Sequence, residues 1–88
     1  MRTDFAVVVP AYDEAEVIAD TVVALRDAFE RYGLDGEVIV VDDGSRDDTA
    51  RIATEAADGW SAFRLFRHRV NLGKTEAMLT AAARTTRT

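Results

Sequence analysis

The sequence predicts an α/β fold, a Rossmann-like half-sheet of three parallel strands with three helices. Three apolar runs, at residues 5–9, 37–41 and 63–67, alternate with segments of helical periodicity. Strands that alternate with helices in this way are joined by right-handed crossovers, which makes them parallel. Charged residues interrupt only the third run, so we place that strand at an edge of the sheet, in the order 3-2-1.

The first helix is predicted from a regular apolar face. Its residues recur at spacings of three and four: Ile18, Val22, Leu25, Phe29 and Tyr32. Asp13 is predicted to cap this helix, with Glu16 three residues later in a box-like pattern, and Gly33 to end it.

The second and third helices are shorter. The second is predicted to start near Asp47, with Ser45 as its cap, and to close at Asp58 and Gly59. We expect it to bury Ile52, Ala53, Ala56 and Ala57. The third follows a glycine-containing loop and carries Ala77, Met78, Ala81 and Ala82. Trp60 is predicted to pack on the end of the sheet.

The first strand is the one that this topology leaves uncovered. We expect it to be buried on both faces, and Pro10 to end it. With no fourth strand beside it, its outer edge would be bare and open to pairing with another chain. The segment 1–88 is therefore expected to be the N-terminal part of a larger domain.

Composition excludes several classes of protein. A formal net charge of −5 argues against a nucleic-acid-binding surface, and the absence of cysteine excludes disulfides and thiolate metal sites. The chain contains neither a signal-peptide pattern nor an apolar stretch of the roughly 18 residues that a membrane span needs. We expect a cytoplasmic protein, held at the cytoplasmic membrane face if further sequence carries an anchor.

The candidate functional residues follow the three strands directly. They lie at 10–14, 42–45 and 67–74, and the carboxyl ends of parallel strands form one rim, where such folds bind ligands. Tyr12 can stack on a nucleobase, and a carboxylate at Asp42 or Asp43 can accept hydrogen bonds from the base. Lys74, at a helix start, suits a phosphate group. The rim therefore predicts a nucleotide site.

Taken together, the three rim segments resemble the successive signatures of family 2 glycosyltransferases, which have a GT-A fold. The segments read VPAYDE at 9–14, VDDGSRDDT at 41–49 and NLGK at 71–74, and the resemblance covers essentially the whole chain. The last of these looks closest to the polyprenyl-phosphate (dolichol-phosphate type) sugar transferases. The resemblance implies a nucleotide-diphosphate-sugar donor and, as one acceptor, a lipid phosphate.

The resemblance also implies which positions contact the nucleotide. They are Pro10, Ala11, Tyr12, Glu14, Val41, Asp42, Asp43 and Lys74. The first loop would hold base and ribose, the end of the second strand would read the base edge, and Lys74 would lie near the diphosphate. The sequence departs from the family at Asp13, where asparagine is usual, and at Thr75 and Glu76, where a small residue is commoner.

The metal-binding and catalytic residues of the family have no counterpart in this chain. The Asp-x-Asp motif that holds Mg²⁺ or Mn²⁺ normally follows a fourth strand, and the aspartate that acts as general base comes later still. We therefore expect Mg²⁺ or Mn²⁺ in the full-length enzyme, with ligands outside this chain. Asp42 and Asp43 are not assigned to a metal, no catalytic residue is assigned, and the chain alone is expected to be inactive.

Structural alternatives remain open for each of these residues. Asp42 to Ser45 could form only a turn and a cap, Tyr12 could be a packing aromatic, Glu14 could serve only the helix dipole, and Lys74 could simply be solvated. His68 is expected to be exposed, and Arg64, Arg67 and Arg69 to protect an edge strand. Two alternative functions also stay open: a non-catalytic nucleotide-binding fragment or remnant, and a receiver-like signalling domain.

Overall fold

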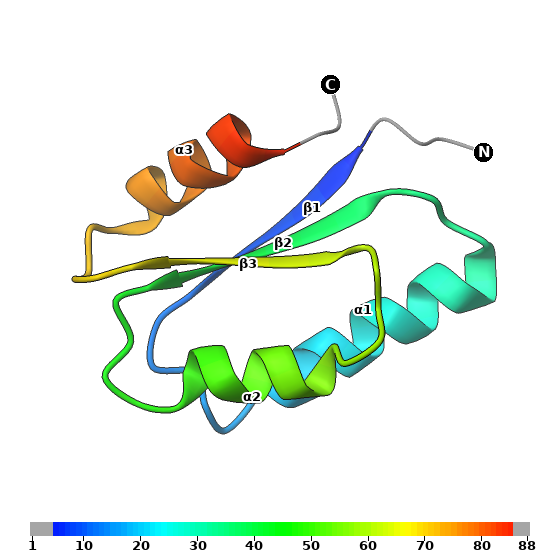
Figure 1. Cartoon of the computed structure of the whole chain (residues 1–88), viewed down its shortest axis with the longest axis horizontal. Helices are drawn as coiled ribbons and strands as arrows, with labels where there is room; N and C mark the ends of the chain where they lie inside the picture. Colours follow the sequence, from blue (N-terminus) through cyan, green and yellow to red (C-terminus); the bar gives the residue numbers. More distant parts are fainter. Residues whose placement is uncertain (1–4, 86–88) are drawn as a thin grey trace.

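A computed structural model describes residues 5–85. The first four and the last three residues of the predicted segment 1–88 lie outside the described range. Strands and helices alternate along the chain, as predicted (Figure 1). The elements are β1 (Ala6–Ala11), α1 (Ile18–Tyr32), β2 (Glu37–Asp43), α2 (Thr49–Ala56), β3 (Phe63–His68) and α3 (Lys74–Arg84). This alternation confirms the α/β class.

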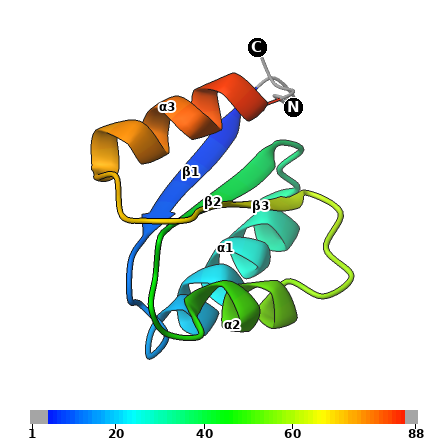
Figure 2. The same ribbon diagram turned by 60° about the vertical axis from the view of Figure 1, so that its left-hand side comes forward.

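The three strands form one parallel sheet with β2 in the centre. The order β1-β2-β3 confirms the predicted 3-2-1 arrangement, with β3 at an edge. In register, Ala6 pairs with Glu37, and Val38 pairs with Phe63. Helices α1 and α2 cover one face of the sheet and α3 covers the other (Figures 1 and 2). All seven residues of β2 are buried.

The alternation of side chains along β2 divides the core into two clusters. Val40 points to the face covered by α1 and α2, where it packs with Val22 and Ala53. Its neighbours Ile39 and Val41 point to the other face, against α3. Burying each of these aliphatic side chains contributes about 1.5–3 kcal/mol to folding. The same alternation continues to the end of the strand, where it separates the next two residues, Asp42 and Asp43.

The predicted apolar faces of the helices are mostly correct. In α1, Ile18, Val22 and Phe29 are buried, and Gly33 ends the helix in the left-handed region at φ 60°, as predicted. Tyr32 is 67% exposed, contrary to prediction, because Phe29 already completes the core by packing on Phe5 and Trp60. Trp60 also stacks on Phe63, the first residue of β3, in agreement with its predicted place on the end of the sheet.

Helix α3 buries a narrower stripe than predicted. Ala77 and Ala81, one turn apart, are fully buried against the sheet. Met78 and Ala82 are exposed, because each lies one residue beyond this stripe and about 100° further round the helix. Because Ala77 and Ala81 are small, α3 lies close to β2. This close packing holds Lys74, the first residue of α3, near the end of β2.

Strand β1 runs two residues further than predicted and is only half-buried along residues 6–9. Its outer edge pairs with none of the strands in the described range, as predicted, and this open side explains the partial burial. Pro10 lies within the strand instead of ending it. The carbonyl of Phe5 accepts a hydrogen bond from the Glu37 N–H (3.2 Å), so by alternation Pro10 faces the open edge. There its missing N–H removes no bond to β2.

None of the helices within residues 5–85 combines the length and the apolar character that crossing a membrane requires.

Candidate functional site

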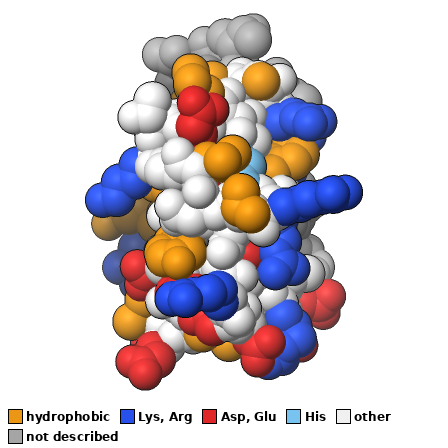
Figure 3. All heavy atoms as spheres, turned by 90° about the vertical axis from the view of Figure 1, so that its left-hand side faces the viewer, with side chains coloured by type: hydrophobic (Ala, Val, Ile, Leu, Met, Phe, Trp, Pro, Cys, Tyr) orange, Lys and Arg blue, Asp and Glu red, His pale blue; other side chains and the backbone are white. Residues whose placement is uncertain are grey.

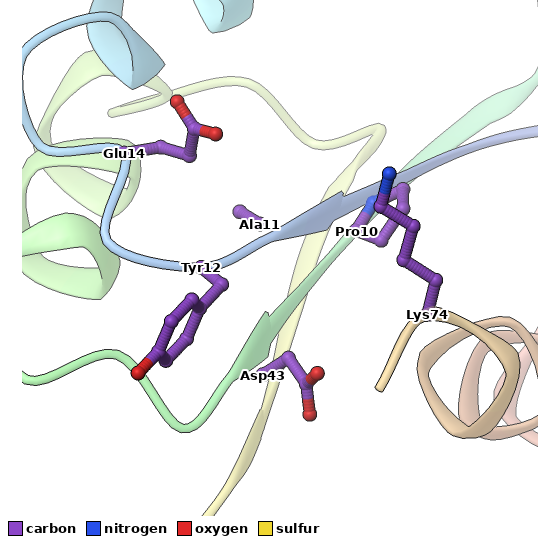
Figure 4. Close-up of a pocket in the computed structure, with 6 residues that line it drawn as sticks. All are labelled: Pro10, Ala11, Tyr12, Glu14, Asp43 and Lys74. Atoms are coloured by element: carbon purple, nitrogen blue, oxygen red, sulfur yellow. The ribbon is translucent and has the colours of Figure 1, made fainter. Parts of the chain in front are cut away.

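A cavity of about 250 Å³ lies at the carboxyl ends of the strands. Six of the predicted contact residues line it: Pro10, Ala11, Tyr12, Glu14, Asp43 and Lys74 (Figure 4). They come from the end of β1 and the loop after it, from the last residue of β2 and from the first residue of α3. Figure 4 shows the Lys74 side chain extending from the start of α3, with the ring of Tyr12 and the Asp43 carboxylate apart from it in this view.

The exposure of these side chains separates possible ligand contacts from structural residues. Tyr12 is 40% exposed, and Glu14 and Lys74 are also exposed, so their side chains are accessible to a ligand. Val41 and Asp42 were predicted to contact the nucleotide, but both are 0% exposed and neither lines the cavity. Their contact with the nucleotide stays a prediction; in the structure they are buried because β2 is the central strand, covered on both faces up to its last residues.

Asp43 fastens the β3–α3 loop to the end of β2. Its Oδ1 accepts a hydrogen bond from the Leu72 N–H and its Oδ2 one from the Gly73 N–H, both at 2.8 Å. The Asn71 side-chain amide donates to the Asp43 carbonyl oxygen (3.2 Å). Lys74 directly follows these donors, so Asp43 determines where the cationic side of the cavity lies.

The Asp43 carboxyl keeps its negative charge despite being buried. Burial by itself would raise its pKa, but the Leu72 N–H, the His68 ring and the Gly73 N–H together hold the pKa below its ordinary value. The carboxylate is therefore acceptor-only at neutral pH. A ligand group that approaches it must bring a hydrogen-bond donor.

His68 is not the exposed residue that the sequence suggested. Its side chain is only 10% exposed, with Nδ1 2.8 Å from Oδ1 of Asp43 and Nε2 2.7 Å from the Thr80 hydroxyl. The parallel register places His68 beside Asp43, and both side chains point to the α3 face. The prediction failed because the third strand runs one residue further than the periodicity indicated.

Gly44 allows the β3–α3 loop to come close to β2. A Cβ at this position would lie 2.3 Å from the Asn71 nitrogen and 2.3 Å from the Val70 carbonyl carbon. Its φ of 74° is also in the left-handed region that side chains disfavour. The turn after Asp43 is therefore shaped by contact with the loop that carries Lys74.

Asp42 points to the other face of the sheet. Its Oδ1 accepts a hydrogen bond from the Ser45 N–H (3.1 Å), and its Oδ2 lies 3.3 Å from Nε of Arg67 without hydrogen-bond geometry. Arg67 was predicted only to protect the edge strand. It also provides the positive charge next to this fully buried carboxylate, because the register pairs the two residues. Asp42 therefore has a structural role beneath the cavity.

Side-chain hydrogen bonds join the β1–α1 loop to the β2–α2 loop. The Asp13 N–H donates to Oγ of Ser45 and the Glu14 N–H to Oγ1 of Thr49, each at 2.9 Å. In the opposite direction, the Arg46 N–H donates to Oδ1 of Asp13 (2.8 Å). These bonds fix the backbone from Tyr12 to Glu14.

These contacts overturn both predicted helix caps. Asp13 does not cap α1, which begins at Ile18 without a side-chain cap; its φ of 51° is one that Asp tolerates better than most residues. Ser45 does not cap α2, which begins at Thr49, two residues after the predicted start. Both side chains bond to the facing loop instead, an alternative that short polar side chains have whenever two loops meet.

Asp47 and Thr49 are two further residues that the sequence reasoning missed. Oδ1 of Asp47 accepts hydrogen bonds from the Thr49 hydroxyl and from the Thr49 N–H, and its Oδ2 accepts one from the Ala15 N–H. The bond from the Thr49 hydroxyl is the main reason why the pKa of Asp47 lies below its ordinary value. The available signal was the short polar side chains of Ser45, Asp47 and Thr49, which readily bond to nearby backbone N–H groups.

The charges around the cavity do not suit a metal ion. Within residues 5–85, no group of three or more potential ligand residues could hold one. Of the acidic pair, Asp42 is buried beside Arg67, and Asp43 already accepts two backbone N–H bonds. Figure 3, which views the face at the carboxyl ends of the strands, shows acidic, basic and hydrophobic side chains intermixed. The described residues therefore do not fit the divalent ion of the family.

The fold and the cavity define the class of protein: an α/β domain whose candidate ligand site lies beyond the carboxyl ends of parallel strands. The sequence profile described as Glycosyl transferase family 2 matches residues 6–87. Because this match spans nearly the whole sequence, the chain belongs to glycosyltransferase family 2.

Individual relatives agree with this assignment. A dolichyl-phosphate β-glucosyltransferase of Trichomonas vaginalis is 42% identical over 76 residues, a match that covers 81% of this chain and 23% of that protein. An undecaprenyl-phosphate 4-deoxy-4-formamido-L-arabinose transferase of Enterobacter sp. is 38% identical over 53 residues, covering 60% of this chain and 16% of that protein. These two names confirm the resemblance to polyprenyl-phosphate sugar transferases.

A solved structure gives the same result for the fold. The chain superposes with a TM-score of 0.73 on a mannosyltransferase of Pyrobaculum calidifontis in complex with GDP-mannose and Mn²⁺. The two are 29% identical, and the match covers 98% of this chain and 25% of the other. The chain thus spans a quarter or less of the length of the relatives described here.

Proposed function

We propose that this segment binds the nucleoside end of a nucleotide-diphosphate-sugar donor, and that the whole protein transfers the sugar to a polyprenyl phosphate. The observation that carries the proposal is the cavity: six residues chosen from the sequence as nucleotide contacts line one hollow beyond the strand ends. Membership of glycosyltransferase family 2 supports the reaction class. The names of the two relatives, which refer to dolichyl and undecaprenyl phosphate, support the acceptor class.

Four of the six lining side chains have a role that their chemistry supports. The half-exposed ring of Tyr12 offers a face for base stacking, which contributes about 1–3 kcal/mol per base in nucleic-acid complexes. The ionised Asp43 accepts hydrogen bonds from base N–H groups. Glu14 is exposed on a fixed backbone, where it can accept from ribose hydroxyls, and Lys74 offers its ammonium group to a phosphate.

The charge of the cavity supports a need for a divalent ion. Two carboxylates and one ammonium group line it, so Lys74 alone would not neutralise a diphosphate. We therefore place Mg²⁺ or Mn²⁺ on the diphosphate, with protein ligands outside the described residues. The related mannosyltransferase in complex with GDP-mannose and Mn²⁺ supports this choice. A donor site of this kind suits the cytoplasm, at the membrane face that carries the lipid acceptor.

A non-catalytic nucleotide-binding fragment is the second candidate. It is favoured by the fact that all six residues lining the cavity lie within this chain. A receiver-like signalling domain is disfavoured, because it would carry its acidic pair after the first strand. Here the acidic pair ends β2, and β1 ends in Ala11.

The proposed function is tested by titrating the ¹⁵N-labelled chain with UDP and with GDP, each with and without Mg²⁺, and following backbone shifts by NMR. We expect shifts at Tyr12, Glu14, Asp43 and Lys74 with one of the two nucleotides. Tyr12→Ala should weaken binding about tenfold through lost stacking. Tyr32→Ala, which removes an exposed tyrosine at the far end of α1, is the matched control and should bind normally. A folded chain that binds neither nucleotide would contradict the proposal.

A further inference from the structure

His68 and Thr80 form a partly buried bridge with Asp43, but neither of these two residues has a role in the proposed contacts with the nucleotide. The bridge joins the end of β2, the end of β3 and the middle of α3 through two short contacts, 2.8 Å at Nδ1 of His68 and 2.7 Å at Nε2. His68 does not line the cavity, but Asp43, its partner, does. The bridge therefore lies directly behind one wall of the candidate site.

The ionised state of Asp43 determines which ring nitrogen of His68 carries the proton in their contact. An ionised carboxylate can only accept, so Nδ1 of His68 must carry the proton in this contact. The Thr80 hydroxyl then serves Nε2, as donor if the ring is neutral. An Asp–His–hydroxyl chain also occurs in nucleophilic triads, but Thr80 is not among the residues that line the cavity, and its hydroxyl is engaged by the inward-facing ring. This arrangement suits support of Asp43, not attack by Thr80.

We propose that His68 is a positioning residue, which holds the Asp43 carboxylate in the orientation that binds the nucleotide and keeps the start of α3 in place. The inference rests on the proposed function, because it concerns the same cavity. Oδ1 of Asp43 is shared between His68 and the Leu72 N–H, and Oδ2 is held by the Gly73 N–H. Without the histidine, the carboxylate loses one of the three donors that fix its orientation.

The second half of the bridge extends the same effect to α3. Thr80 lies six residues after Lys74, within the same helix, between the buried Ala77 and Ala81. His68 thus links α3 to the Asp43 side chain, which also accepts hydrogen bonds from the β3–α3 loop. The Asp43 carboxylate and the backbone of Lys74 are thereby held in place relative to each other, which reduces the ordering that ligand binding would otherwise require.

Two conservative variants separate the two halves of the bridge. Asparagine places its amide nitrogen near the position of Nδ1, so His68→Asn can still donate to Asp43 but cannot reach Thr80. Glutamine places its amide near the position of Nε2, so His68→Gln can reach Thr80 but leaves Asp43 without this donor. We expect His68→Gln and His68→Ala to weaken nucleotide binding about tenfold, the effect of one hydrogen bond to a charged group, and His68→Asn to restore most of it.

The experiment measures UDP and GDP affinity by NMR for the full chain and these variants, together with hydrogen exchange of the Leu72 and Gly73 amides. Exchange at both amides should accelerate in His68→Gln and remain slow in His68→Asn. Arg69→Ala, which changes an exposed neighbour of His68, is the control and should alter neither quantity. Equal affinities for the Asn and Gln variants, or wild-type affinity for His68→Ala, would overturn the inference.

The outcome remains distinguishable from failure of the proposed function. If the wild-type chain is folded but binds neither nucleotide, the proposed function is wrong. Amide exchange then remains the test of the positioning role of His68. Equal protection of the Leu72 and Gly73 amides in the Asn and Gln variants would refute that role. If His68→Ala does not fold, the Asn and Gln pair still carries the test. Chemical shifts of Val22 and Ala53, in the opposite core cluster, report whether each variant is folded.

Discussion

Asp42 and Asp43 are neighbours of the same residue type, but they lie on opposite faces of the sheet in different surroundings. Asp43 faces α3 and receives hydrogen bonds from two backbone N–H groups, with His68 beside it. Asp42 faces α1 and α2, accepts one backbone N–H bond, and has a single cation, Arg67, next to its other oxygen. Only Asp43 reaches the cavity.

The comparison shows that the environment of each carboxylate, and not its type, assigns its role. Backbone N–H groups are fixed in place, so the donors around Asp43 are pre-organised for a negative charge. The side chain of Arg67 is 57% exposed, so solvent screens its attraction for Asp42. We therefore expect the Asp43 side to be the more sensitive to mutation.

Asp43→Ala should have the largest effect. It leaves the Leu72 and Gly73 N–H groups and the His68 ring without their acceptor, and we expect a loss of about 3 kcal/mol in the free energy of unfolding. Urea denaturation of the wild-type chain and of Asp43→Ala measures this difference in the free energy of unfolding. Nucleotide affinity should fall more than tenfold in the same variant. A loss no greater than that of Asp42→Asn would remove the distinction between the two faces.

Gly44→Ala should destabilise the chain by about 2–3 kcal/mol, because the new Cβ collides with the backbone of the β3–α3 loop. Gly59→Ala is the matched control: its φ is 77°, close to the 74° of Gly44, but a Cβ there meets no atom within 4 Å. The control should show only the conformational cost of about 1–2 kcal/mol. Thermal unfolding of both variants separates the cost of the backbone conformation from the cost of the steric clash. Equal losses of stability in the two variants would contradict the close contact of Gly44 with the β3–α3 loop.

Arg67→Met should cost about 1 kcal/mol, because it removes the cation beside buried Asp42 while keeping much of the apolar stem. Adding Asp42→Asn to this variant should recover part of the loss, since the uncompensated charge is then gone. A double-mutant cycle in urea gives the coupling between the two residues. Strictly additive losses would mean that the 3.3 Å approach contributes no stability.

Acidification should produce the smallest effect, confined to low pH. The pKa values of Asp43 and Asp47 are lower in the folded chain than the ordinary 3.8. Their contribution to stability is therefore complete above about pH 4 and is lost as the pH falls through the folded values. Urea midpoints measured from pH 5 down to pH 2 should show this loss. The slope should be smaller in Asp43→Asn, and an unchanged slope would argue against the lowered pKa of Asp43.

Local sequence signals predicted the elements and much of the rim. The apolar runs and the period of three to four residues gave the strands and helices, because burial on a sheet or helix face needs that spacing. The rule that parallel strands gather their carboxyl ends then brought Tyr12, Asp43 and Lys74 together. These inferences need only the order of the elements.

The contacts that the sequence did not predict depend on register and on which loops meet. His68 becomes the partner of Asp43 only once β2 and β3 are extended to their last residues and aligned. Asp13 and Ser45 looked like helix caps because the same short side chains suit caps and loop-to-loop bonds equally well. Only the three-dimensional approach of the two loops decides between these roles.

Pro10 sets a limit on how far the sheet can be extended beside the cavity. A strand added to the outer edge of β1 could accept hydrogen bonds from the N–H groups of Ala6 and Val8, but Pro10 has none to offer. The added strand would thus lack one backbone hydrogen bond at Pro10, which also lines the cavity. An added strand is expected to stop or turn away at that point, which would keep the mouth of the cavity open to solvent while the rest of the edge is sealed.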